Sequence, residues 1–182
     1  MLLSWVIFIL GFSYVLALPT CSDDEISACG NLGEKDWKGK QWPENAIELD
    51  KACSQVQGAL ECQIAVAERC SNTLLRMFLG YMKESQKLHK KLCSTFDPLR
   101  IKFLRTVPCL NSAIEQLYSH CKSLTSVQEA GGFCAYNFKV LSCVQSGLQS
   151  KCGDETMHVF NALYEPMIEL DKIFCRKDDN LV

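Results

Sequence analysis

The residues with the most evident chemistry are the twelve cysteines, because a cysteine can form a disulfide, bind a metal or act as a nucleophile. Four of them run from Cys134 to Cys175 with eight, eight and twenty-two residues between them. Four in the earlier part of the chain run from Cys53 to Cys93 with eight, seven and twenty-two residues between them. The two patterns of cysteine spacing differ by one residue in one interval, which indicates an internal duplication.

The N-terminus decides which of these uses applies. Residues 1–17 contain no charge and are mostly apolar, and Val15 and Ala17 suit the small-residue positions before a cleavage site. We predict a signal peptide cleaved after Ala17. An uncleaved anchor helix is the alternative, but the apolar run is short for a span of about 20 residues. We therefore expect a secreted, extracellular protein with no membrane span after cleavage.

In an oxidising compartment an even number of cysteines favours disulfides over metal binding. We expect disulfides at all twelve positions, which are Cys21, Cys29, Cys53, Cys62, Cys70, Cys93, Cys109, Cys121, Cys134, Cys143, Cys152 and Cys175. The pairing stays open. Bridges within each half allow fifteen pairings per half, and bridges between the halves would join them into one domain.

Other residue types offer little catalytic chemistry. His89, His120 and His158 do not have a metal-binding spacing, and His89, which lies among lysines, is expected to be solvated. The chain has no Gly-x-Ser-x-Gly or His-Glu-x-x-His motif. We expect no catalytic, cofactor-binding or metal-binding residue. The net charge of −2 gives no electrostatic reason to expect a nucleic acid partner.

The elements that must position the cysteines are helices. The sequence predicts an all-α, disulfide-rich helical bundle over 18–175, built from two related helical halves at about 21–93 and 109–175. A seam at 94–108 joins the halves, and 176–182 form a polar tail. Short helices are marginal alone, so bridges at their ends would hold each pair together.

In the first half, Pro43 is expected to open a helix and Gly58 to interrupt it. Cys53 and Cys62 are nine residues apart, which places them on opposite faces of a continuous helix. We therefore expect them to bond to different elements.

In the seam, Asp97 and Pro98 have the residue types of an N-cap and a first helical position, and Pro108 is expected to end this short helix. Its interior, 100–105, alternates basic and apolar residues. A helix packed on the core is the leading interpretation, and contact with a membrane surface is the alternative.

In the second half, 109–121 are expected to be helical and 123–132 to form a loop, with Gly131 and Gly132 as its clearest helix breakers. Gly153 should end the next helix, and Pro166 should kink the last one near Leu163 or lengthen a local hydrogen bond.

Large apolar side chains suggest where a ligand could bind. Trp37 and Trp42 either cover the helical core or form an exposed partner contact. Adaptable methionines and aromatic rings on the long helices could line an apolar cavity, and we select Phe78, Met82, Phe160, Tyr164 and Met167. The alternative is that these side chains fill an ordinary core.

The cysteine count, the helical spacing and the two steps of eight residues ahead of twenty-two-residue intervals resemble a known family. It is the twelve-cysteine extracellular domain of unknown function found in nematode and arthropod secreted proteins. The resemblance covers Cys29 to Cys175 and implies an all-helical, extracellular module with six disulfides. It implies no catalytic residues.

These observations favour a secreted, non-enzymatic binding protein. Its ligand would be an apolar small molecule, a lipid or an extracellular protein. An extracellular interaction or matrix component, or a venom or salivary factor, is the second hypothesis, and an enzyme is the third. A cavity of a few hundred Å³ would favour the first, and a contiguous exposed apolar patch the second.

Overall fold

A computed structural model describes residue 29 and residues 42–69 and 73–175. The regular structure of these residues is helical, without a strand: α3 (Ala46–Arg69), α4 (Thr73–Cys93), α5 (Pro98–Ser123), α6 (Val127–Ala130) and α7 (Phe133–Cys175). The prediction of an all-α, disulfide-rich fold is confirmed. Among the described helices, none is both long enough and apolar enough to cross a membrane.

Several sequence predictions fall outside the described residues. They concern the signal peptide at 1–17, Cys21, Trp37, Cys70 and the tail at 176–182.

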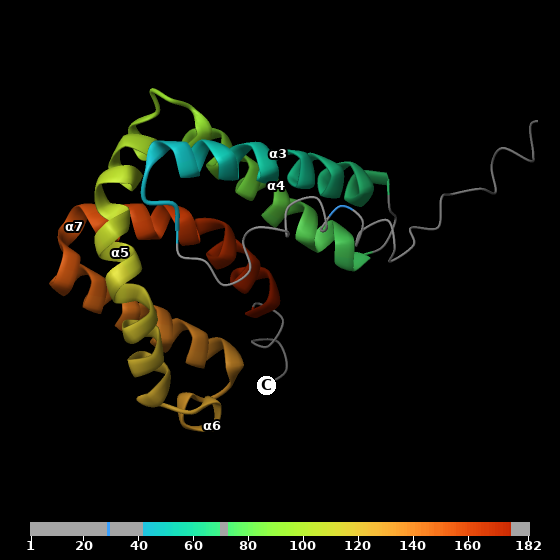
Figure 1. Ribbon diagram of the computed structural model, residues 1–182. Helices are drawn as coiled ribbons and strands as arrows, with labels where there is room; N and C mark the ends of the chain where they lie inside the picture. The colour runs from blue at the N-terminus through green and yellow to red at the C-terminus, as the bar shows by residue number, and fades with distance from the viewer. Residues whose placement is uncertain (1–28, 30–41, 70–72, 176–182) are drawn as a thin grey trace, which may run out of the picture.

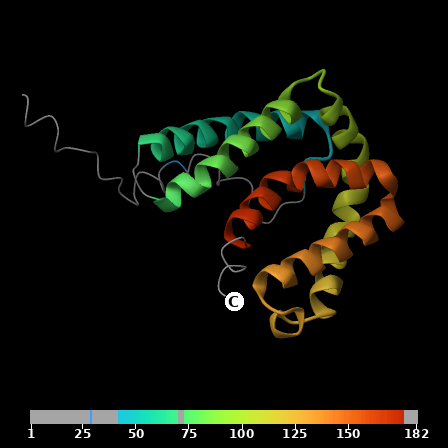
Figure 2. The same cartoon turned by 180° about the vertical axis from the view of Figure 1, so that it is seen from behind.

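The helices form two antiparallel pairs (Figures 1 and 2). α3 and α4 lie side by side in one pair, and α5 and the first part of α7 form the other. α7 bends sharply at Gly153, whose φ of 81° and ψ of 176° are not helical, and this confirms the expected end of a helix there. The second part of α7 then passes between the two pairs.

The ten described cysteines form five bridges, and each bridge stays within one half of the chain. The pairs are Cys29–Cys62, Cys53–Cys93, Cys109–Cys152, Cys121–Cys143 and Cys134–Cys175. Cys53 and Cys62, on opposite faces of α3, therefore bond to different elements, as expected.

The bridges also follow one order. Within the second half, the first cysteine pairs with the fifth, the second with the fourth and the third with the sixth. The two described bridges of the first half likewise join its second cysteine to its fourth and its third to its sixth.

Local capping explains where several helices begin and end. Asp97 is the N-cap of α5, since its carboxylate accepts a hydrogen bond from the Leu99 N–H at 2.8 Å, and Pro98 takes the first helical position. Gly131 and Gly132 have φ values of 90° and 122°, which residues with a Cβ rarely adopt. These glycines therefore break the chain before α7, as predicted, but the expected loop at 123–132 contains the short helix α6, which begins at a capping box of Ser126 and Glu129.

Three predictions about prolines and glycines in the first half and the seam are wrong. α3 does not open at Pro43, because Asn45 caps it by accepting the Glu48 N–H at 2.9 Å. Gly58 does not interrupt α3, and Pro108 does not end α5, which continues to Ser123. A proline costs a helix one hydrogen bond, and burial of apolar side chains on both sides of Pro108 offsets that cost.

Pro166 lies in the second part of α7, which curves along its length but continues as one helix through the proline (Figures 1 and 2). The sharp turn, with non-helical backbone, is at Gly153. A glycine with positive φ changes the chain direction more sharply than a proline whose φ is already helical.

Two clusters of buried apolar side chains form the core. The first, the shared cluster, takes residues from both halves and from the seam: Leu49, Leu92, Phe103, Val107 and Val159. The second lies within the second half: Leu110, Ala113, Leu117, Cys121, Val140, Val144, Leu148 and Phe160. α5 and α7 contribute to both clusters, so the halves are packed together.

The seam is part of this packing. Arg100 is 4% exposed; one guanidinium nitrogen contacts Asp50 at 2.7 Å and the other donates to the Leu92 carbonyl at 3.2 Å. Phe103 is also buried. Residues 100–105 therefore belong to a helix packed on the core, which was the leading interpretation.

Candidate functional site

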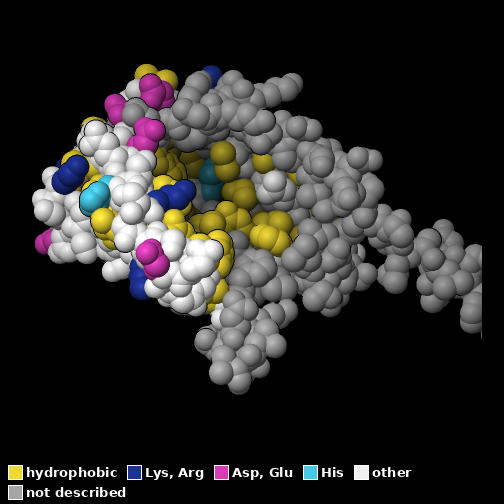
Figure 3. All heavy atoms as spheres, turned by 90° about the horizontal axis from the view of Figure 1, so that it is seen from below, with side chains coloured by type: hydrophobic (Ala, Val, Ile, Leu, Met, Phe, Trp, Pro, Cys, Tyr) yellow, Lys and Arg dark blue, Asp and Glu magenta, His cyan; other side chains and the backbone are white. Residues whose placement is uncertain are grey.

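The largest apolar concavity with a described lining is a cleft between α3 and α4. Its volume is about 580 Å³, and its lining includes Phe103 of α5 and Trp42, which precedes α3. Drug-sized ligands occupy cavities of about 300–1,000 Å³. Hydrophobic side chains also gather in a hollow of the molecular surface in Figure 3. The cleft is large enough for a small organic ligand.

Among the residues that the structure describes, the lining of the cleft contains no Asp, Glu, Lys or Arg. Four polar side chains interrupt the apolar surface: Gln63, Tyr81, Ser85 and His89. Each can form hydrogen bonds, but none offers the fixed charge that an ionic group would need after leaving water. The cleft therefore suits an uncharged ligand with a small polar group.

Two contacts fix the antiparallel register of α3 and α4. The Cys53–Cys93 bridge joins the helices near the start of α3 and the end of α4. An ion pair of 2.7 Å joins Glu68, near the end of α3, to Lys83, in the middle of α4. Gln63, Tyr81 and Ser85 lie toward the ion-paired end of the cleft.

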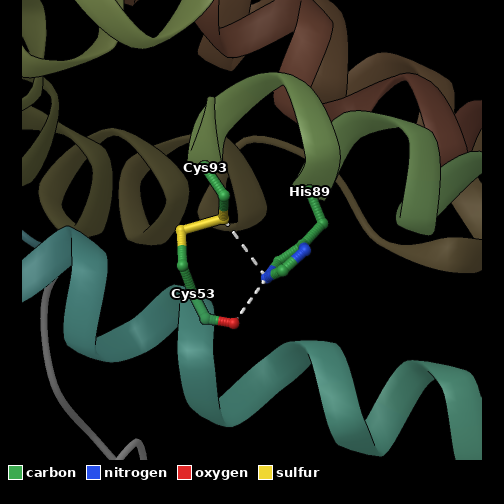
Figure 4. A group of neighbouring side chains, drawn as sticks. All are labelled: Cys53, His89 and Cys93. Carbon is green, nitrogen blue, oxygen red and sulfur yellow. Dashed lines mark hydrogen bonds between the residues drawn. A yellow bond between two sulfur atoms is a disulfide. The ribbon is translucent and has the colours of Figure 1, made fainter. Parts of the chain in front are cut away.

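His89 packs against the Cys53–Cys93 bridge (Figure 4). Its Nε2 lies 3.1 Å from the Cys53 carbonyl oxygen and 3.3 Å from the Cys93 Sγ. A carbonyl only accepts hydrogen bonds, so Nε2 is the nitrogen that bears the proton and donates it. The prediction that His89 is simply solvated is wrong, because its position four residues before Cys93 places it on the face of α4 that meets α3.

The environment of His89 favours the neutral ring. Burial lowers the pKa of His89 below its ordinary value, while the hydrogen bond to Cys53 and the charge of Glu61 act in the opposite direction. The imidazole then adds no charge to the cleft near pH 7.

The same three residues have the donor types of a metal site. The donor atoms of Cys53, His89 and Cys93 all lie within 4.8 Å of one another. Both sulfur atoms are joined in the bridge, however, and a metal binds the thiolate form of cysteine. The arrangement therefore stabilises a helix pair and does not offer a metal-binding set while the bridge is intact.

A smaller cavity of about 230 Å³ lies in the second half, between α5 and α7. Phe160 and Tyr164, two of the residues selected from the sequence, line it, and their rings stack with centroids 5.6 Å apart. Burial is the main cause that raises the pKa of Tyr164, and Asp171 and Tyr118 add to the shift. The Tyr164 hydroxyl therefore remains a neutral hydrogen-bonding group.

The other three selected residues lie elsewhere. Phe78, Met82 and Met167 are half-buried and belong to the lining of neither the cleft nor the smaller cavity.

Trp42 belongs to the lining of both cavities. Its ring meets Phe103 edge to face with centroids 6.1 Å apart, and the residue is 39% exposed. Of the two alternatives for this tryptophan, the structure supports a cover over the core.

Sequence reasoning missed the residues that form the cleft: Leu49, Ala52, Leu88, His89 and Phe103. Leu49 and Ala52 are in the helical stripe that predicts α3, and His89 lies one turn before Cys93. These patterns identify faces of helices, but they do not show which faces meet or how much space remains between them.

Searches against protein-family models, curated proteins and solved structures find no match to this chain.

Proposed function

We propose that this protein is a secreted, non-enzymatic binding protein for an uncharged apolar small molecule or lipid. The observation that supports the proposal is the 580 Å³ cleft between α3 and α4, whose described lining residues carry no fixed charge. Its few polar groups could orient a ligand, and its apolar walls would supply most of the binding free energy.

A binding role fits the chemistry of the cleft better than catalysis does. His89 is the titratable imidazole in the lining, and its proton-bearing nitrogen is already engaged by the Cys53 carbonyl. The sulfur beside it is in a disulfide and is not a nucleophilic thiolate.

Secretion is part of the proposal. Five bridges persist only in an oxidising compartment, and they agree with the expected signal peptide at 1–17. Protein collected from the medium of eukaryotic cells should begin at Leu18 on N-terminal sequencing. Retention in membranes with an intact N-terminus would contradict this part of the proposal.

We also infer that the two halves arose by duplication. The common order of pairing in the two halves supports this inference. If it extends to the whole chain, Cys21 should pair with Cys70. Mass spectrometry of peptides from the unreduced protein tests the pairing, and Cys21 linked to any other residue would contradict it.

Ligand binding can be tested with N-phenyl-1-naphthylamine, a neutral probe that becomes fluorescent in apolar sites. Native mass spectrometry before and after organic extraction provides an independent measurement, because a bound molecule adds mass that extraction removes. The proposal expects saturable probe binding by the extracted protein. No probe binding and no extractable mass would overturn it.

A matched pair of variants locates the site. Ala52 is buried and lines the cleft, whereas Ala65 lies on the same helix and is exposed. Ala52→Phe should fill the cleft and reduce probe affinity at least tenfold. Ala65→Phe should leave the affinity unchanged. Equal effects of the two substitutions would show that the probe binds elsewhere.

An extracellular interaction component is the second candidate. Leu124, Val127 and Phe133 are exposed, at 61%, 37% and 64%, and they flank or begin the short helix α6. Clustered apolar side chains on a surface can mark a protein interface. Protein that carries no extractable ligand and binds no probe would favour this candidate over the first.

A further inference from the structure

Trp42 lies between two apolar cavities. It shares the wall of the α3/α4 cleft with Phe103 and Leu49, and the wall of the smaller α5/α7 cavity with Leu110 and Phe160. Within the described part of the chain, the lining of the smaller cavity, like that of the cleft, contains no Asp, Glu, Lys or Arg. Trp42 therefore borders two cavities whose described linings carry no charged side chain.

A buried asparagine holds this tryptophan in place. Asn111 of α5 is 5% exposed, and its Oδ1 accepts the Trp42 N–H at 3.0 Å. Its Nδ2 donates to the Trp42 carbonyl at 2.8 Å and to the Glu44 Oε1 at 2.9 Å. The Asn111 side chain therefore pairs both the N–H and the carbonyl of Trp42, which fixes the chain before α3 on α5.

The two ends of the cleft differ in polarity. Gln63, Tyr81 and Ser85 lie toward the end where Glu68 and Lys83 form their ion pair. Trp42 and Phe103 lie at the other end, near the Cys53–Cys93 bridge, where most of the lining is apolar. An amphiphile would therefore be oriented with its polar group near Tyr81 and its apolar end near Trp42.

We propose that the cleft binds a single-chain amphiphile with an uncharged polar head, such as a long-chain alcohol, and that Trp42 limits the length of its chain. The inference rests on the proposed binding function and deepens it. The head contacts Gln63, Tyr81 and Ser85, and the chain ends against the Trp42 ring. Removal of that ring joins the cleft to the smaller cavity and admits longer chains.

The experiment measures displacement of N-phenyl-1-naphthylamine from the mature protein by a series of primary alcohols from octanol to eicosanol. Affinity should rise about fourfold with each buried methylene until the chain reaches Trp42, and then stop rising. In Trp42→Ala the rise should continue for several more methylenes. Phe96→Ala is the control, because Phe96 is 89% exposed and lines neither cavity; it should keep the wild-type limit.

The chain length at which affinity stops rising should also depend on the size of the side chain at position 42. Trp42→Phe, which keeps a smaller ring in the same position, should give a shift between those of the wild type and Trp42→Ala. This variant also preserves the test if Trp42→Ala fails to fold, which intact mass and circular dichroism would reveal. An identical limit in the wild type and Trp42→Phe, or a shift in Phe96→Ala, would overturn the role of Trp42.

The uncharged head is tested separately. At pH 8, hexadecan-1-ol should bind at least tenfold more tightly than hexadecanoate, because the lining offers the carboxylate no cation. Equal binding of the two would overturn the proposed ligand class. If the wild type binds the fluorescent probe but no alcohol displaces it, this inference fails and the general binding function survives. If it binds neither, both fail.

Discussion

The two halves of the chain share an order of disulfide pairing but differ in how their helices fill the space between them. The buried side chains of α3 are mostly small: Leu49, Ala52, Ala59, Val66 and Ala67. The cluster of the second half contains larger side chains, including Leu110, Leu117, Leu148 and Phe160. The space that remains is about 580 Å³ beside α3 and about 230 Å³ between α5 and α7.

The glycines differ between the halves in the same way. A Cβ on Gly147 of α7 would lie 2.4 Å from Leu117 Cδ2, so the missing side chain allows α5 to approach α7 closely. A Cβ on Gly58 of α3 or Gly80 of α4 would have no neighbour within 4 Å. Disulfides can therefore set which helices pair, while side-chain size decides whether a pair encloses a cavity or a filled core.

The largest predicted effect tests whether the two halves, although packed differently, unfold together in one cooperative transition. Phe103 belongs to the shared cluster, and Phe103→Ala should reduce the free energy of unfolding by about 3–5 kcal/mol. Leu148, which belongs to the second-half cluster, is the comparison. Chemical denaturation followed by tryptophan fluorescence and by circular dichroism should give one coincident transition, which both Phe103→Ala and Leu148→Ala shift to lower denaturant. Two transitions, with Leu148→Ala moving only one, would show that the halves unfold separately.

The next effect concerns close packing in the second half. Gly147→Ala would gain about 1 kcal/mol of helix stability but force Leu117 to move, and overpacking of a buried site costs about 1–3 kcal/mol. We expect a net loss of about 1 kcal/mol in denaturant titrations. In a Leu117→Ala background the same substitution should no longer be destabilising, because its steric partner is absent. A loss that persists in that background would mean that Leu117 is not the cause.

The sequence predicts the fold class well because cysteine spacing and helical periodicity are local properties. Asp97, Gly131 and Gly153 also act through their own backbone or the next turn, and all three predictions are confirmed. Pro108 shows the limit of this reasoning. Its local preference is to end a helix, but tertiary packing of the residues on both sides continues α5 through it.

The candidate site was harder to predict, because a cavity depends on which helix faces meet. Phe160 and Tyr164 were found because aromatic rings at helical spacing identify an apolar face. Ala52 is buried and lines the larger cleft, and a buried alanine gives no sequence pattern that separates a cavity from a close contact. Trp42 is placed by Asn111, which is sixty-nine residues away in the chain.

A smaller effect of opposite sign is expected in the first half. Gly58→Ala adds a methyl group in open space on an exposed face of α3 and should increase the free energy of unfolding by about 1 kcal/mol. Thermal unfolding should show a higher midpoint, while binding of N-phenyl-1-naphthylamine stays unchanged because Gly58 does not line the cleft. A destabilised Gly58→Ala would remove the contrast with Gly147.

The smallest effect compares two titratable residues at matching positions, His89 and Asp171. Each lies four residues before the last cysteine of its half, and burial favours the neutral form of both by lowering the pKa of His89 and raising that of Asp171. As the pH falls through 6.5, the unfolded chain protonates its histidine before the folded protein does, so stability should fall. Asp171 has the opposite effect as the pH falls toward 3.8. Its pKa is raised, so the folded protein binds this proton before the unfolded chain does, and stability should recover.

Urea titrations from pH 8 to pH 3 separate these two contributions. His89→Gln should abolish the loss below pH 6.5, and His120→Gln, at an exposed histidine of α5, should retain it. Asp171→Asn should remove the recovery near pH 3.8 and leave the loss near pH 6.5 intact. Both changes should be small because each side chain is partly exposed, so solvent screens its charge, and because the charge of Glu61 opposes the effect of burial on the pKa of His89. Equal effects of His89→Gln and His120→Gln on the loss of stability below pH 6.5 would show that the environment of the Cys53–Cys93 bridge does not cause this loss. The two halves would then be alike in their response to pH.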